Sequence, residues 1–130
     1  MNEAKGIIAA LAVALVALIP AQAALAGDPE PRPSKLAADQ ATLPPGQVMR
    51  ETFTPGGGIV QMYYRCKPGV SGRLALFEEG RKGALANRQM VCDDEVHRVR
   101  NVPVDVGREH SVELSVADPG FAGYSVWGRR

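Results

Sequence analysis

From Gln47 onward, apolar and polar residues alternate with a period of two, which is the spacing of strands. Residues 59–66 show the pattern most clearly. One face of this predicted strand consists of Val60, Met62, Tyr64 and Cys66. Further strands are predicted around residues 48–53, 73–76, 89–92, 96–106, 111–116 and 123–127. In residues 96–106 the alternation slips near Asn101, which predicts a bulge or a break.

Turn signals separate these segments about every ten residues, as at Lys67-Pro68-Gly69 and Asp118-Pro119-Gly120. Short strands spaced in this way are typical of an all-β fold. We expect a small antiparallel two-sheet sandwich, immunoglobulin-like and of about seven strands. A small open barrel is the alternative architecture.

The start of the chain has a different character. An apolar run from Ile7 to Ile19 ends at Pro20, and small-x-small residues follow, with Ala24-Leu25-Ala26 the preferred cleavage site. The run is shorter than the about 20 residues of a membrane span, so a signal peptide over residues 1–26 is predicted, with an uncleaved N-terminal anchor as the alternative. Residues 27–46 contain five prolines and are expected to form a disordered linker, which leaves residues 47–130 as the folded domain.

Composition narrows the class of protein. The chain has 130 residues, 15 of them Lys or Arg and 14 Asp or Glu, for a net charge of +1. A single small domain of this kind argues against a multidomain enzyme, and the charge balance argues against a nucleic-acid binder. Beyond the signal no membrane span is predicted. We expect a secreted, extracytoplasmic protein.

The sequence contains two cysteines, Cys66 and Cys92. Export would bring them into an oxidising compartment, and both are predicted on inward-facing strand positions. A disulfide between them is therefore expected, and the loop that it closes would contribute about 3–4 kcal/mol to stability.

Candidate chemistry is sparse. Asp93, Asp94, Glu95 and His97 form the densest group of potential cation ligands, but a solvated acidic turn explains the same residues. His110 is expected to lie exposed in a turn. Ser125 resembles the nucleophile of a G-x-S-x-G motif, yet no helix follows it. We therefore predict no catalytic residue, no metal site and no cofactor.

Two surface features could contact a partner. Arg81 and Lys82 lie between two glycines at a predicted hairpin tip and form the candidate partner-contact loop. The second feature is an aromatic strip for sugars or peptides, which would comprise Tyr63, Tyr64, Tyr124 and Trp127.

The segments M-Y-Y-R-C at 62–66 and M-V-C-D-D at 90–94, followed by His97 and alternating valines, resemble small secreted β-sandwich proteins of actinobacteria. The resemblance covers about residues 58–127. It implies the sandwich and one disulfide, and it assigns no catalytic residue, because no activity is established for that group.

These observations predict a secreted, non-enzymatic binding or structural module that contacts an unknown protein or cell-surface ligand. One alternative is a secreted inhibitor of an extracellular protease that acts through Arg81. A small hydrolase or metal-dependent enzyme built around Ser125 or His97 is the other.

Overall fold

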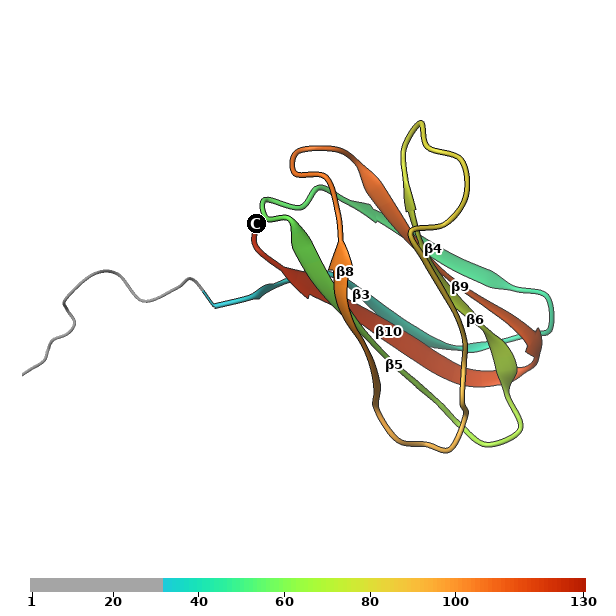
Figure 1. The fold of residues 1–130 in the computed structure, drawn as a ribbon. Coiled ribbons are helices and arrows are strands. Elements are labelled where there is room, and N and C mark those ends of the chain that lie inside the picture. Colours follow the sequence, from blue (N-terminus) through green and yellow to red (C-terminus); the bar gives the residue numbers. More distant parts are fainter. Residues whose placement is uncertain (1–31) are drawn as a thin grey trace, which may run out of the picture. The chain divides into compact units, whose positions relative to one another are not determined.

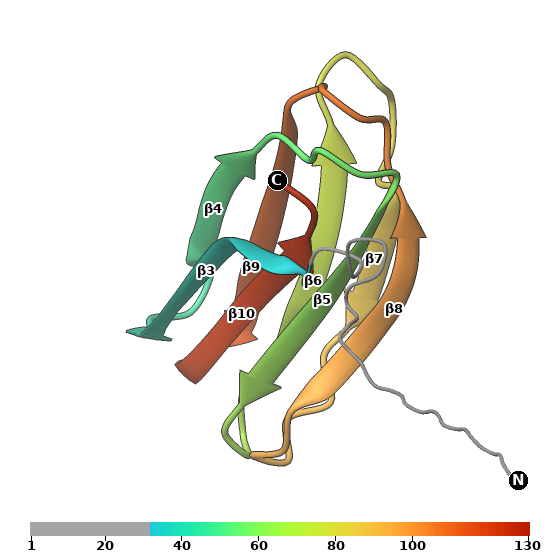
Figure 2. The ribbon, with the colours of Figure 1, turned by 90° about the vertical axis from the view of Figure 1, so that its left-hand side faces the viewer.

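The fold is a sandwich of two four-stranded antiparallel sheets (Figures 1 and 2), seen in a computed structural model that describes residues 32–130. The strands are β3 (Ser34–Leu43), β4 (Val48–Phe53), β5 (Ile59–Cys66), β6 (Ser71–Glu78), β7 (Ala86–Gln89), β8 (His97–Pro103), β9 (His110–Asp118) and β10 (Gly120–Gly128). The predicted all-β sandwich is confirmed. The predicted signal peptide lies outside the described residues.

The two sheets have the orders β3-β10-β5-β8 and β4-β9-β6-β7. Consecutive strands therefore mostly change sheet, and the first and last described strands are neighbours in the same sheet. This is the connectivity of an eight-stranded jelly roll. It corrects the immunoglobulin-like arrangement that we expected, in which seven strands divide between the sheets in another order.

The core lies between the sheets and follows the predicted alternation. In β5 the residues of the predicted inward face are all buried, and in β9 Val112, Leu114 and Val116 are buried in the same way. Leu74 and Leu76 of β6 complete the centre of the core with no exposed surface. Within residues 32–130 no helix has the length and apolar character needed to cross a bilayer.

The prediction of a disordered linker over residues 27–46 was wrong for Ser34–Leu43, which forms β3. This segment contains no proline, since the prolines of the region lie on either side of it. It pairs with β10 along its whole length, from Ser34 opposite Gly128 to Leu43 opposite Gly120. As an edge strand, β3 is exposed over much of both faces, so its sequence lacks the alternation of a half-buried strand.

The segment around residues 89–92 and the irregularity near Asn101 were also predicted. The predicted strand at 89–92 is replaced by β7, which ends at Gln89, because the following residues leave the sheet so that Cys92 reaches Cys66. The predicted irregularity near Asn101 is confirmed. Asn101 has a φ of 50°, and the pairing of β5 with β8 shifts register between Val60 and Met62.

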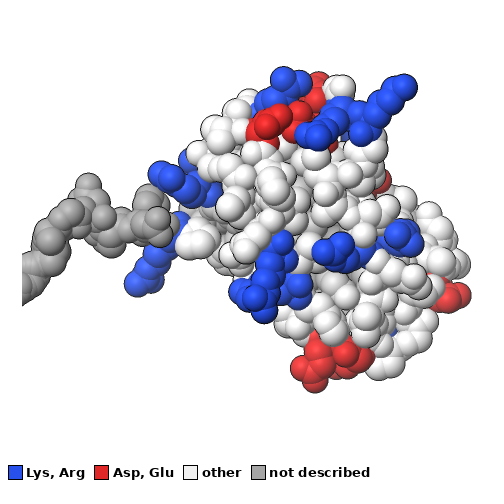
Figure 3. Space-filling view, in the orientation of Figure 1, with Lys and Arg blue, Asp and Glu red and all other residues white. Residues whose placement is uncertain are grey.

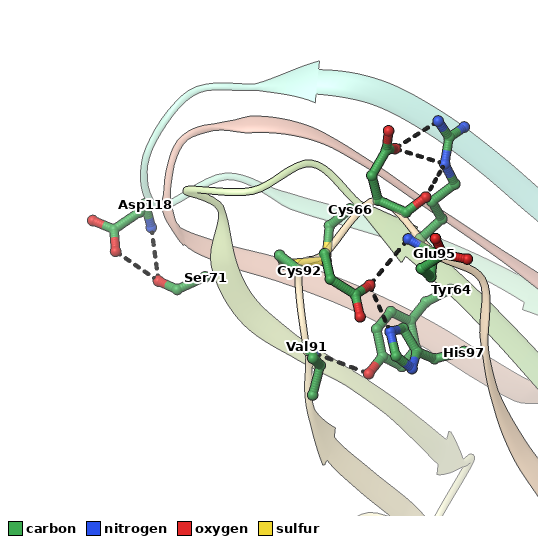
Figure 4. The surroundings of a disulfide bond; sticks show 11 residues. Tyr64, Cys66, Ser71, Val91, Cys92, Glu95, His97 and Asp118 are labelled. Atoms are coloured by element: carbon green, nitrogen blue, oxygen red, sulfur yellow. Dashed lines mark hydrogen bonds and ion pairs between the residues drawn. A yellow bond between two sulfur atoms is a disulfide. The ribbon is translucent and has the colours of Figure 1, made fainter.

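The disulfide between Cys66 and Cys92 is present as predicted (Figure 4). Cys66 lies at the end of β5 in one sheet, and Cys92 follows β7 of the other sheet. Next to it, the Val91 amide donates a hydrogen bond to the hydroxyl of Tyr64, at 3.0 Å. The disulfide therefore ties the two sheets together on the side of the sandwich where β8 and β7 form the edges.

Candidate ligand-binding groove

The outer face of the β3-β10-β5-β8 sheet carries the candidate site. In β10 the alternation turns Phe121, Gly123, Ser125 and Trp127 to this face, because Ala122, Tyr124 and Val126 are buried on the other. Tyr63 of β5 is paired with Ser125 and shares its face. Phe121 and Trp127 are six positions apart along β10, which spans about 20 Å at about 3.3 Å per residue.

Two adjoining hollows lie on this face and form what we call the groove. The first has a volume of about 490 Å³ and lies around Gly123, between Lys35, Gln40 and Arg65. The second, of about 560 Å³, lies around Trp127 and Gln61. Tyr63, Val96 and Ser125 line both hollows, so the two are continuous.

Gly123 keeps the floor of the groove low. A Cβ atom at this position would lie 2.7 Å from Cβ of Gln40 and 3.1 Å from the carbonyl oxygen of Asp39, both on the neighbouring strand β3. A side chain would push β3 away from β10 as well as fill the hollow. The glycine therefore permits both the close strand pairing and the open floor.

Hydrogen bonds and cations fix the aromatic rings of the groove. The indole Nε1 of Trp127 donates to Ser125 Oγ at 2.9 Å, and the Tyr63 hydroxyl donates to Gln61 Oε1 at 3.1 Å. Lys35 Nζ lies 5.6 Å from the centre of the Trp127 ring. Arg65 Cζ lies 6.0 Å from the centre of the Phe121 ring. Each end of the groove thus combines an aromatic ring with a cationic side chain.

The predicted aromatic strip is therefore only partly present. Tyr63 and Trp127 present their rings to the groove. Tyr64 and Tyr124 also border the first hollow, but their side chains are buried on the opposite face of the same sheet. The Tyr124 hydroxyl donates to Glu51 Oε1 at 2.9 Å, and burial together with this carboxylate raises the pKa of Tyr124. Phe121 was missed, although its parity with Trp127 along β10 is the signal that would have found it.

The acidic cluster next to the disulfide is an interlocked turn. Oδ1 of Asp93 accepts a hydrogen bond from the Glu95 amide and lies 2.8 Å from His97 Nε2 (Figure 4). The His97 ring stacks on Tyr64, with ring centres 5.2 Å apart. Arg65 and Lys67 both bind the carboxylate of Asp94. In the part of the chain that the structure describes, no three His, Cys, Asp or Glu side chains are arranged to bind a metal ion.

We expect the ion pairs of this turn to make the stability of the fold depend on pH. The hydrogen bond from Lys67, with the Arg65 guanidinium, holds the pKa of Asp94 below its usual value, and the hydrogen bond to His97 does the same to the pKa of Asp93. A depressed folded-state pKa stabilises the fold above the ordinary aspartate pKa, about 3.9, and this stabilisation is lost as the pH falls through the folded-state value.

We therefore expect Asp94→Asn to lower the urea midpoint at about pH 7 and to leave it close to wild type at about pH 2. Paired urea titrations of the two proteins at both pH values measure this. Glu95→Gln, which removes a neighbouring exposed carboxylate, is the control and should change the midpoint less. An equal deficit for Asp94→Asn at both pH values would contradict the assignment.

His110 is the clearest error of the sequence predictions. It begins β9 and its side chain has no exposed surface, whereas we expected it to lie exposed in a turn. Its Nδ1 lies 2.8 Å from the Arg108 carbonyl oxygen, its ring stacks on Phe53, and its Nε2 faces Glu78 Oε1 at 3.6 Å. These last two atoms are buried and have no hydrogen-bond partner among the described residues.

The predicted partner-contact loop lies apart from the groove. Arg81 and Lys82 are exposed in the connection between β6 and β7, where Gly80 and Gly83 have positive φ angles. Arg81 Nη1 is 4.0 Å from Glu78 Oε1. A role of this loop in binding a partner, including a protease, stays a prediction. Ser125 lines the groove, and no histidine is among the residues that line the two hollows.

No family model matches the chain, and no curated protein matches it. Among solved structures, the carbohydrate-binding module TmCBM61, in complex with beta-1,4-galactotriose, is similar over 72% of this chain and 70% of that chain, with 14% identity and a TM-score of 0.47. This likeness is one of fold, and no functional residue is transferred from it.

Proposed function

We propose that the protein is an exported, non-enzymatic module that binds a saccharide chain in the groove on the β3-β10-β5-β8 sheet. The observation that carries this proposal is the row of three aromatic side chains, Phe121, Tyr63 and Trp127, along one continuous hollow. Buried tyrosines and tryptophans normally serve a core, whereas these three are partly exposed on the outer face. Partly exposed rings with polar neighbours favour ligands that are apolar on one side and hydroxylated at the rim.

The position of the groove favours a saccharide over a peptide. Extended peptides usually bind by adding a strand at a sheet edge, where backbone groups are free. The groove instead lies over β10, whose backbone pairs with β3 on one side and β5 on the other. A peptide main chain lying there would lose its hydrogen bonds to water without replacement. Saccharide hydroxyls need side-chain partners, and Gln40, Gln61 and Ser125 offer both donors and acceptors.

The lining also supports a binding role over hydrolysis. Cleavage of a glycosidic bond usually needs two carboxyl groups on either side of the bond. Asp39 is the one carboxylate among the residues that line the two hollows. Export is supported by the signal-like N-terminal sequence and by the disulfide, which forms and persists in oxidising compartments.

A panel of soluble polysaccharides, neutral and anionic, in affinity electrophoresis and titration calorimetry tests the proposal. We expect Trp127→Ala to weaken binding to the retained polysaccharide at least tenfold, about 1.4 kcal/mol, because it removes the largest ring of the groove. Phe77→Ala is the matched control, since Phe77 lies on the outer face of the other sheet and should leave the affinity unchanged. Retention of no saccharide, or unchanged affinity in Trp127→Ala, would refute the proposal.

A further inference from the structure

We infer that the groove selects anionic saccharides, whose carboxylate or sulfate groups are bound by the cations beside its aromatic rings. This inference rests on the proposed function and adds the class of ligand. It is carried by the two ring–cation pairs at the ends of the groove, Trp127 with Lys35 and Phe121 with Arg65.

The charge of the groove differs from that of the chain as a whole. The lining of the two hollows contains three cationic side chains, Arg32, Lys35 and Arg65, and one acidic side chain, Asp39. Arg98 of β8 is exposed and paired with Tyr63, so it extends the cationic side of the same face. The complete chain has nearly balanced charge, and Figure 3 shows acidic side chains near the top and the bottom of the face in view.

The ring–cation pairs suit the chemistry of an acidic sugar. In such a sugar the ring is hydroxylated and compact, and the charged group projects from it. An aromatic face packs against the sugar ring, while a cation a few ångströms away can bind the anionic group. Lys35 Nζ lies 5.6 Å from the Trp127 ring centre, which is close enough to bind the anionic group of a sugar that contacts the indole.

Arg65 has a second role in the fold, whereas Lys35 does not. Arg65 also holds the turn next to the disulfide, because its Nε donates to both the backbone carbonyl and the carboxylate of Asp94. Replacing Arg65 would disturb that turn as well as the groove. Lys35 is exposed on the edge strand β3 and takes no part in that turn, so its replacement removes a cation of the groove and leaves the turn intact.

The test compares polysaccharides that share a backbone and differ in whether the anionic group is present. Polygalacturonate is compared with its methyl ester, and dextran sulfate with dextran, by titration calorimetry of residues 27–130. We expect at least one anionic member to bind more than tenfold tighter than its neutral counterpart. The binding pair shows whether a carboxylate or a sulfate is recognised. Raising the ionic strength from about 0.01 M to about 1 M, which shortens the screening length from about 30 Å to about 3 Å, should weaken this binding strongly.

Two variants separate a groove contact from general attraction. Lys35→Gln should reduce the affinity for the anionic polysaccharide about fivefold, the loss expected for one surface charge contact. Arg88→Gln changes the net charge equally on β7 of the other sheet and should have no effect. Equal reductions by both variants, or neutral polysaccharides that bind as tightly as anionic ones, would overturn the inference and leave the proposed function standing. Binding to none of the saccharides would overturn both.

Discussion

Reduction of the Cys66–Cys92 disulfide should lower the free energy of unfolding by about 3.5 kcal/mol. The two cysteines are 26 positions apart, and constraining a loop of this length removes that much conformational entropy from the unfolded chain. Small domains have a total stability of about 5–15 kcal/mol, so the loss is a large share of the whole. The jelly roll depends on it because the disulfide joins β5 of one sheet to the segment that follows β7 of the other.

Urea titrations with and without a reductant measure this effect on the unmodified sequence. The double variant Cys66→Ala/Cys92→Ala is the second measurement, and it should lose slightly more, since Cys66 is completely buried and its sulfur also fills the core. The reductant should not shift the midpoint of the double variant. A midpoint of the wild-type protein that does not respond to reduction would contradict the prediction.

The second large effect is expected at His110. His110→Ala should lower the free energy of unfolding by about 3–4 kcal/mol, because it leaves a cavity against Phe53 and removes the group that faces Glu78. Glu78 is itself buried. Without His110 its carboxylate would keep only the partly exposed side chains Arg108, at 3.4 Å, and Arg81, at 4.0 Å.

Glu78→Gln is the matched variant for this prediction. The carbonyl of Arg108 can only accept a hydrogen bond from Nδ1 of His110, while Nε2 of His110 and Oε1 of Glu78 have no hydrogen-bond partner among the described residues. A glutamine amide would supply the donor that Nε2 lacks, and we expect a change below about 1 kcal/mol. Chemical denaturation of both variants decides the matter. A Glu78→Gln loss as large as that of His110→Ala would show that the carboxylate charge, rather than the packing of the pair, stabilises this end of the sandwich.

The alternation of residues was sufficient to predict the central strands. β5 and β9 each have one face against the core and the other toward solvent, so apolar and polar residues alternate along their sequences. β3 was not predicted because its residues do not alternate in this way. Its burial follows no strict alternation, and the prolines on either side made the region look like a linker.

The groove could be anticipated only in part. Parity separates Tyr63 from Tyr64 in β5 and places Phe121 on the same face as Trp127 in β10, but no local pattern encodes the pairing of β10 with β3 and β5 that brings these rings together. The same is true of His110. Its surroundings in the sequence, Gly107-Arg108-Glu109, are those of a turn, and its burial comes from the distant residues Phe53 and Glu78.

The position of β10 bears on how an exported chain would mature. This last strand is inserted between β3, the first described strand, and β5, so it pairs with two segments that lie more than 50 residues before it in the sequence. Such non-local pairing slows folding. A polypeptide that passes through a translocation channel N-terminus first could therefore not complete this sheet until residues 120–128 had emerged. The groove that we propose as the saccharide site would then form only on the far side of the membrane.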